Sequence, residues 1–299
     1  MIIDYDYLSK IKKAVSLYTR RKTSNILEGE FRSIYKSRSM DFEDLKEYTP
    51  GDEVHDIDWK SSSRMGTTLV RRYMTDRRHN VMFVCDCGAK MRGDTPGGEP
   101  KAEVTLLTFG TVAYMVERCG ADVALAYPQD SSSVISSFGG GTDHLEELLY
   151  GYEKVICNDP HRSAEQTLKD VLDTINKTMI IFFISDVETL SRMDTNLLRA
   201  VSENHDIVML GIEDASLFGD NVYDLDRGSY EKFFISHSKA LREFVRDHKR
   251  EMAASIDLKC RESRSSAISI ACAGDIIDGS VILLDWYKHG NYGYITSSI

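Results

Sequence analysis

The chain has 299 residues, of which 42% are hydrophobic, so it is long enough to bury a sizeable core in one or two domains. The contents of Cys, Pro and Gly are ordinary, which argues against collagen-like, disulfide-rich and disordered classes. The formal net charge is -10 at pH 7, and an acidic surface repels a phosphate backbone, so nucleic-acid binding is not expected.

No targeting or membrane-spanning segment is predicted. Residues 1–13 contain acidic side chains and no apolar run long enough for a signal peptide. The apolar stretches at 179–184 and 281–284 are far shorter than the roughly 20 residues that cross a bilayer. The six cysteines form no CxxC pair, which argues against a zinc site. We therefore expect a reduced, cytoplasmic protein without membrane insertion.

Residues 1–80 are predicted to form an N-terminal helix and a small β-rich element. Apolar residues at helical spacing indicate a helix over residues 5–27. Residues 28–80 contain short β-like pieces and a turn signal at Pro50 and Gly51.

Apolar runs alternate with helical patterns from residue 81 to residue 215. The strand-like runs are 81–85, 122–127, 179–185 and 207–212. Near-continuous apolar strands alternating with helices predict a doubly wound, mostly parallel α/β sheet that is covered on both faces. Residues 216–299 are assigned to a C-terminal helical region and tail, with a polar helix over 229–254. Whether residues 229–299 fold back on the α/β domain stays open.

Acidic residues follow the predicted strands at the edge where open parallel sheets bind ligands. Asp86 follows the first strand, Asp186 the third, and Glu213 and Asp214 the fourth. An Asp at a strand end also commonly caps a helix, so each of these residues has a purely structural explanation as well.

Residues 81–214 resemble a von Willebrand factor A domain. The metal-ion-dependent adhesion site of that family uses Asp-x-Ser-x-Ser after the first strand, a Thr from a later loop and an Asp after a further strand. The resemblance implies Asp86 as the first Asp, Thr142 as the Thr and Asp186 as the last Asp. Gly88 and Lys90 occupy the two serine positions.

The segment before residue 81 closely resembles the signature of domain-of-unknown-function family fifty-eight. The signature residues present here are Glu47, Tyr48, Pro50, Gly51, Asp52, Asp58, Trp59, Arg64 and Arg71. We expect Tyr48 and Trp59 to pack, Asp52 to shape a turn, and Asp58 to pair with Arg64.

The two serine replacements predict a site without metal. Magnesium prefers six oxygen ligands in octahedral geometry. Gly88 removes one hydroxyl group, and Lys90 supplies an ammonium group that cannot coordinate a cation at neutral pH. Lys90 can instead pair with Asp86 or Asp186 and replace the charge of the metal. We therefore predict no cofactor, and a docking face at Asp86, Lys90, Thr142 and Asp186.

The sequence contains no recognisable catalytic set. Its serine runs lack a nucleophile context, and it has neither GxxxxGK[ST] nor GxGxxG. His144 is expected to cap the helix that follows Thr142.

The leading hypothesis is a non-catalytic protein-interaction or adaptor subunit. The family resemblance implies a MoxR-type AAA+ ATPase as its partner in protein assembly or remodelling. One alternative is a metal-dependent adhesion module, in which water and Asp143 replace the lost serines and magnesium binds a protein ligand. The others are a hydrolase that uses the strand-end carboxylates and a peripheral membrane protein.

Overall fold

The computed structural model describes residues 9, 11, 42–50, 52, 54–73, 79–218, 222–231 and 239–296. Most of the helix predicted over residues 5–27 lies outside this part of the chain. Ser9 and Ile11 are helical, and Ile11 is fully buried.

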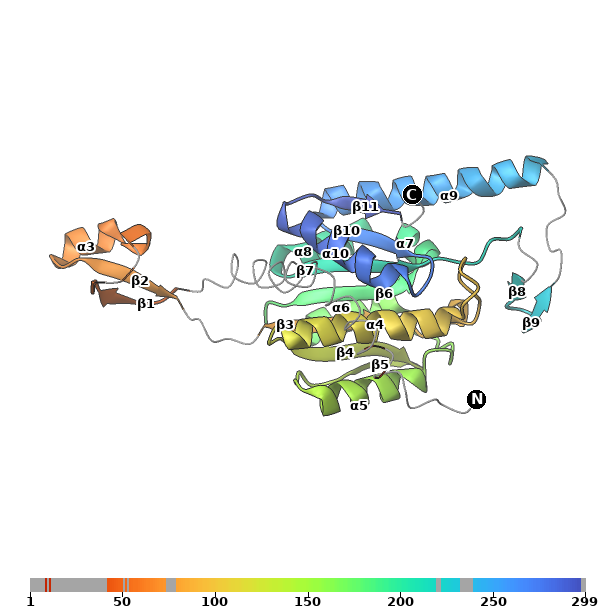
Figure 1. Ribbon diagram of the computed structural model, residues 1–299, viewed down its shortest axis with the longest axis horizontal. Helices are drawn as coiled ribbons and strands as arrows, with labels where there is room; N and C mark the ends of the chain where they lie inside the picture. The colour runs from red at the N-terminus through yellow and green to blue at the C-terminus, as the bar shows by residue number, and fades with distance from the viewer. Residues whose placement is uncertain are drawn as a thin grey trace.

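A seven-stranded sheet with the order β11-β10-β7-β6-β3-β4-β5 forms the centre of the molecule (Figure 1). Its strands are β3 (Asn80–Cys85), β4 (Asp122–Gln129), β5 (Ser132–Ile135), β6 (Ile180–Asp186), β7 (Asp206–Ile212), β10 (Ser266–Ile270) and β11 (Gly293–Ile295). Neighbouring strands are parallel except for β4 and β5, which are antiparallel. The predicted doubly wound, mostly parallel sheet is therefore confirmed.

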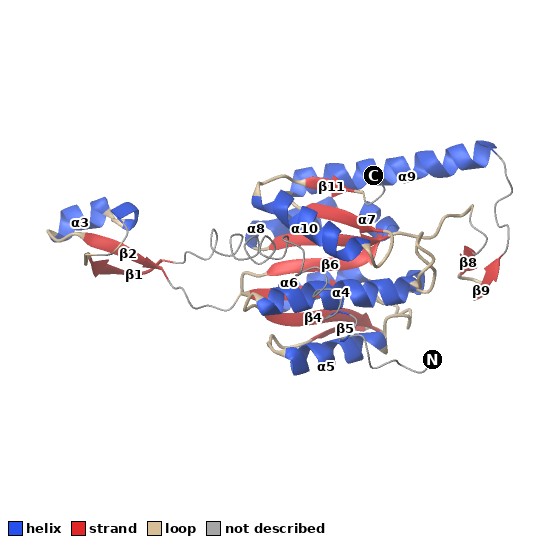
Figure 2. Ribbon diagram, viewed as in Figure 1, coloured by secondary structure: helices blue, strands red, loops and turns tan. Residues whose placement is uncertain are grey.

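Helices cover both faces of this sheet (Figure 2). The helices are α4 (Lys101–Arg118), α5 (Thr142–Glu153), α6 (Ala164–Thr174), α7 (Val187–Arg192), α8 (Thr195–Asn204), α9 (Lys239–Ser263) and α10 (Asp275–Lys288). Val81 and Phe83 of β3 face the core that α4, α5 and α10 cover. Met82 and Val84 face the core under α6 to α9. This alternation explains why β3 reads as a continuous apolar run, since side chains on both faces of the strand are buried.

The domain boundary predicted at residue 215 is wrong. β10 pairs in parallel with β7, and β11 pairs with β10, so the C-terminal part of the chain completes the central sheet. The expected helical content is present in α9 and α10. Residues 229–231 are not helical, however, because they form β9 (Ser229–Glu231), which pairs with β8 (Val222–Asp224). Runs as short as β10 do not reveal by periodicity whether they are strands or helices.

A small unit with its own two-stranded antiparallel sheet precedes β3, as predicted. It consists of β1 (Phe42–Glu47), the 3-10 helix η1 (Val54–Asp56), α3 (Trp59–Met65) and β2 (Leu69–Tyr73). Leu69 and Val70 are buried in it.

The signature residues of this unit shape one turn and one helix cap. Asp52 accepts hydrogen bonds from the backbone and hydroxyl groups of Thr49 and lies 2.5 Å from Lys46 Nζ, which stabilises the predicted turn. Asp58 caps α3 by accepting hydrogen bonds from two backbone N–H groups of its first turn. The predicted pair of Asp58 with Arg64 is wrong. Arg64 lies in the last turn of α3, away from the cap, and the Asp58 carboxylate instead pairs with Arg71, whose Nε is 3.2 Å away.

The aromatic signature residues do not pack as expected. Trp59 is 67% exposed and Tyr48 is 37% exposed. Trp59 is the first residue of α3, and a short helix with no buried residue offers its side chain no core. Glu47 and Pro50 are also exposed, whereas Gly51 lies outside the described residues.

Within the described ranges, none of the helices is both long enough and apolar enough to cross a bilayer.

Candidate interaction site at the carboxyl edge of the sheet

The parallel strands β3, β6 and β7 end at the same edge of the sheet, which we call the carboxyl edge. The structure brings Asp86, Asp186 and Asp214 to this edge, as the sequence predicted from their positions after the strands. The backbone N–H of Asp86 donates to the carbonyl oxygen of Ile184 at 2.9 Å, which extends the pairing of β3 with β6 up to the site.

Asp86 is held from three sides. The Ser185 hydroxyl group donates to Asp86 Oδ2 at 2.6 Å, and the backbone N–H of Gly88 donates to Oδ1 at 3.0 Å. The Tyr152 hydroxyl group donates to the carbonyl oxygen of Asp86 at 2.5 Å. Burial raises the pKa of Asp86, and the neighbouring charge of Asp186 adds to this, against the opposing hydrogen bond from Ser185.

Asp186 is fully buried and caps α7. Thr189 donates to it from its backbone N–H at 2.9 Å and from its hydroxyl group at 2.6 Å. Burial favours the neutral form. The positive charge of Lys101, the Thr189 hydrogen bonds and the charge of Lys90 outweigh it and lower the pKa of Asp186. Asp186 therefore stays ionised at neutral pH.

Lys90 occupies the centre of the edge. Its Nζ lies 3.6 Å from Asp186 Oδ1 and 3.1 Å from Glu188 Oε2. The pairing with Asp186 that the sequence suggested is present. Lys90 is a residue of the 3-10 helix η2 (Ala89–Met91), which directly follows Asp86 and Gly88 and so carries the ammonium group over β6.

A second lysine, Lys101, lies beneath the edge and was not identified from the sequence. Its side chain is fully buried, and its Nζ donates to Asp214 Oδ1 at 2.6 Å. Lys101 begins α4, where a lysine ordinarily faces solvent. The one sequence signal was the position of Lys101, directly after Pro100 at a predicted helix start. This helix follows the strand that ends just before Asp86.

The residues of the edge do not fit a divalent metal. Both oxygens of Asp86 accept hydrogen bonds from protein donors, and both oxygens of Asp186 accept from Thr189. Gly88 supplies no side-chain oxygen, and the ammonium group of Lys90 lies 3.6 Å from Asp186 Oδ1, where a magnesium site needs an oxygen ligand. In the described part of the chain, no three His, Cys, Asp or Glu residues are grouped so that they could hold a metal ion.

Thr142 does not belong to this site, which corrects the prediction. The antiparallel strand β5 returns the chain to the opposite edge, where Gly139 bridges Val123 near the start of β4. The backbone N–H of Gly141 donates there to the Glu117 carboxylate at 3.0 Å. His144 does not cap α5 either, because its Nε2 lies 2.9 Å from the carbonyl oxygen of Val123.

The loop between α5 and α6 takes the place expected of Thr142. Asp159 Oδ1 accepts a hydrogen bond from the backbone N–H of Ala89 at 3.0 Å, and the Asp159 N–H donates to the Cys87 carbonyl at 3.0 Å. Asp159 has φ 54, a conformation that Asp tolerates better than most residues. The Asn-Asp-Pro turn at 158–160 was the sequence signal for this loop.

The cysteines beneath the edge are poorly suited to nucleophilic chemistry. Cys85 and Cys87 are fully buried, and burial raises the pKa of both thiols. Because the thiolate is the reactive form, these side chains remain unreactive thiols at neutral pH.

Residues 44–257 match the family described as "Protein of unknown function DUF58". The chain belongs to this family. No protein with a curated description matches the sequence.

Several solved structures are similar to the DUF58 chain. Conserved hypothetical protein BatB from Bacteroides thetaiotaomicron has 9% identity and a TM-score of 0.45, with 71% of this chain and 99% of that chain covered. A von Willebrand factor type A protein from Catenulispora acidiphila has 11% identity and a TM-score of 0.38, with 75% and 45% covered. The SpRpn10 VWA domain has 13% identity and a TM-score of 0.34, with 68% and 95% covered.

Proposed function

We propose that this protein is a non-catalytic interaction subunit that docks a partner protein at the carboxyl edge. We further propose that the partner is a MoxR-type AAA+ ATPase, with which the protein acts in the assembly or remodelling of other proteins. The observation that carries the docking proposal is the position of Lys90, a half-buried cation held between Asp186 and Glu188 at the centre of the edge.

The edge combines fixed charges of both signs. Lys90 and Glu188 are each about one-third exposed, and Asp214 is 59% exposed, so a partner can reach all three. Lys90 is paired with the buried Asp186 and Asp214 with the buried Lys101, so contacts within the protein hold these two side chains. Charge patterns of this kind determine which partner fits and how fast it associates, more than they determine total affinity.

The same contacts argue against the other candidate functions. A metal-dependent adhesion module needs oxygen ligands at both serine positions, whereas Gly88 supplies none and Lys90 places an ammonium group 3.6 Å from Asp186 Oδ1. A hydrolase needs an activated nucleophile beside a base, and the buried thiols of Cys85 and Cys87 are deactivated.

The test is a binding assay between the full chain and a purified MoxR-type ATPase, with and without ATP. We expect Lys90→Glu to weaken binding at least about tenfold, because it reverses the central charge beside two carboxylates. Lys90→Gln removes the charge without reversing it, and it should also weaken binding. This variant repeats the test if the charge reversal disturbs folding. Lys169→Glu on α6 is the matched charge reversal, and Thr142→Ala probes the opposite edge. Both are expected to bind normally.

The effect of EDTA is measured without ATP, because EDTA would otherwise remove the metal ion that accompanies the nucleotide of the ATPase. We expect EDTA to leave the interaction unchanged under this condition. Equal binding by wild type and Lys90→Glu would overturn the docking proposal. Absence of binding to such an ATPase would overturn the choice of partner, and loss of binding in EDTA would favour the metal-dependent adhesion module.

A further inference from the structure

The two outer edges of the central sheet differ in how the protein covers them. β11 forms one edge, where the backbone N–H of Tyr294 donates to Asp257 Oδ1 of α9 at 3.1 Å. β5 forms the other edge, at the opposite end of the sheet (Figure 1). An unpaired strand edge is a template for another strand, and proteins usually block such edges with charges, proline or a covering element.

The outward backbone groups of β5 belong to Ser133 and Ile135. Alternate residues of an antiparallel strand bond to the neighbouring strand, and the N–H of Ser136 donates to the carbonyl oxygen of Leu125 at 2.9 Å. Val134 is therefore in the phase that bonds to β4, and the N–H and C=O groups of Ser133 and Ile135 point away from β4. These four groups have no hydrogen-bond partner among the described residues.

The usual blocking devices are missing along this edge. Residues 131–142 contain no charged side chain and no proline. The edge also continues past β5, because Gly139 pairs with Val123 through backbone hydrogen bonds of 2.7 and 3.1 Å. The surface that can pair with an added strand is therefore longer than the four residues of β5.

Contacts with α6 hold β5 in place. The Ser133 hydroxyl group donates to Asp170 Oδ2 at 2.6 Å and accepts from Arg162 Nε at 3.0 Å. Ile135 packs on the core of the same face. Because successive side chains of a strand alternate, Val134 faces the opposite side, which α5 covers. The edge is thus already shaped, so an added strand does not have to order it.

The helix on the other face of β4 is acidic. α5 packs there through apolar residues that include Leu145 and Leu149. Its outward side carries Asp143, Glu146 and Glu147, which are all exposed, and the helix contains neither Lys nor Arg. A basic segment is therefore attracted to this end of the sheet, while an acidic segment is repelled.

We propose that β5 accepts an extended, basic segment of a partner protein as an additional strand of the sheet. Backbone groups of the segment bond to those of Ser133 and Ile135. Every second side chain of the segment lies beside Val134 on the face of α5, where a Lys or Arg meets the acidic helix. This site is separate from the carboxyl-edge cluster, so either proposal can fail without the other.

A second copy of this chain fits the edge less well. Antiparallel pairing of two β5 strands brings two acidic α5 helices to the same face of the joined sheet. Each chain also has a formal net charge of -10, so the copies repel one another.

The experiment measures fluorescence anisotropy of a labelled synthetic peptide in which lysine alternates with valine or threonine, titrated with the full chain. We expect saturable binding. Two isomeric peptides carry backbone N-methyl groups, one on every lysine and the other on every valine and threonine. Each pattern blocks one edge of an extended strand and leaves the other edge intact. One isomer should therefore bind as the parent peptide does, and the other should bind at least about tenfold more weakly.

Variants of β5 locate the binding site on the protein. Ile135→Pro removes an outward N–H group and no donor to β4, so it should weaken binding at least about tenfold. Val134→Lys and Val134→Glu disturb the same half-buried position with opposite charges. The first should weaken binding of the lysine peptide and the second should tighten it. This pair of variants repeats the test if Ile135→Pro lowers the melting temperature.

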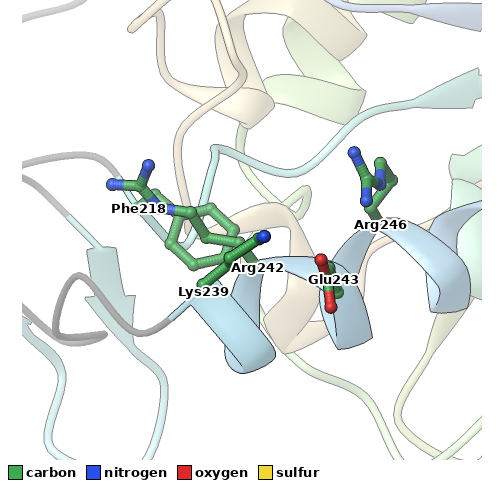
Figure 3. Close-up of a pocket in the computed structure, with 5 residues that line it drawn as sticks. All are labelled: Phe218, Lys239, Arg242, Glu243 and Arg246. Atoms are coloured by element: carbon green, nitrogen blue, oxygen red, sulfur yellow. The ribbon is translucent and has the colours of Figure 1, made fainter.

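The control for overall charge is Arg246→Gln. It changes the net charge of the chain by the same amount as Val134→Glu, but in a concavity at the start of α9 that lies outside β5 (Figure 3). The residues that line this concavity are Phe218, Lys239, Arg242, Glu243 and Arg246. Arg246→Gln should leave the affinity for the peptide unchanged.

Three results would overturn the proposal: absence of saturable binding, equal affinities of the two methylated peptides, or equal effects of Arg246→Gln and Val134→Glu. Sedimentation velocity of the chain without peptide tests the other occupant. A dimer that Ile135→Pro converts to a monomer would also overturn the proposal and identify β5 as an interface between two copies.

Discussion

Lys101 Nζ lies 2.6 Å from Asp214 Oδ1, and this contact joins a fully buried lysine to a carboxylate that is 59% exposed. The two residues are 113 positions apart and connect the start of α4 with the end of β7. The charge of Lys101 also lowers the pKa of the buried Asp186 against the effect of burial. The ammonium group of Lys101 thus supplies positive charge under the carboxyl edge.

Replacement of this cation should destabilise the fold. We expect Lys101→Met to cost about 3 kcal/mol of unfolding free energy, because it leaves the buried Asp186 without its main counter-charge. Urea denaturation measures this cost, and Lys169→Met, at a half-exposed site, should stay within about 0.5 kcal/mol of wild type.

The loss of unfolding free energy in Lys101→Met should become smaller as the pH falls. Asp186 has a lowered pKa in the folded state, so it contributes stability above the ordinary carboxyl pKa and loses it as the pH falls. The difference between wild type and Lys101→Met should therefore be largest near pH 7 and shrink as the pH falls below about 4. A difference that grows toward acid would contradict this account.

Restoring the two hydroxyl groups should create metal affinity. An added Cβ at Gly88 would lie 3.3 Å from Asp86 Oδ1, so Gly88→Ser fits with a small adjustment. We expect Gly88→Ser combined with Lys90→Ser to gain a higher melting temperature in millimolar Mn²⁺. At ten times the dissociation constant the gain is about 1.4 kcal/mol.

Wild type should melt at the same temperature in Mg²⁺, Mn²⁺ or EDTA. Thermal unfolding followed by circular dichroism compares the proteins. Stabilisation of wild type by Mg²⁺ would be evidence for the metal-dependent adhesion module.

The Tyr152 hydroxyl group should stabilise the chain at Asp86. Tyr152 is fully buried, and its hydroxyl group donates to the Asp86 carbonyl at 2.5 Å. Tyr152→Phe keeps the ring but leaves this carbonyl without its donor, so a loss of about 1–2 kcal/mol is expected in urea denaturation. Tyr150→Phe is the control, because Tyr150 is 43% exposed, and it should be neutral. Equal effects of the two changes would refute the role of the hydroxyl group.

The contacts in the turn around Asp52 predict how the pKa of its carboxyl group responds to mutation. The hydrogen bond from Lys46, with those from Thr49, lowers the pKa of Asp52 from 3.8 to about 2. Asp52 therefore favours the folded turn above pH 3.8, and this contribution is lost as the pH falls toward 2. Lys46→Met should raise the pKa of Asp52 toward 3.8 in a carboxyl NMR titration, whereas Lys60→Met should leave it low. An unchanged pKa in Lys46→Met would disprove the assigned cause.

Ile11 and Gly110 offer a test of how the side chain of Ile11 packs on α4. A Cβ added at Gly110 would lie 2.4 Å from Ile11 Cδ1 and 3.0 Å from Leu149 Cδ2. Gly110→Ala should therefore destabilise the protein by about 1–3 kcal/mol, although Ala is the better helix former. In an Ile11→Ala background the same change should cost less, and a double-mutant cycle in urea measures the coupling. Additive effects would mean that Ile11 does not pack on Gly110.

The sequence by itself determined the alternating α/β architecture and the acidic strand ends. Buried parallel strands such as β6 need apolar side chains on both faces, and this requirement is visible as an unbroken apolar run. Parallel strands end at one edge, so Asp86 and Asp186 had to meet there. The nearby Lys90 was close enough in sequence to be paired with one of them.

Only the tertiary structure decided which edge the later loops reach. A two-residue turn at Asp130 and Ser131 reverses the chain into β5, so the glycine loop and Thr142 return to the edge opposite Asp86. The tertiary structure alone also decided that Lys101 pairs with Asp214 and that β10 completes the sheet beside β7. These contacts join segments far apart in the chain. Their partners are selected by the packing of the whole core and leave no local periodicity to detect.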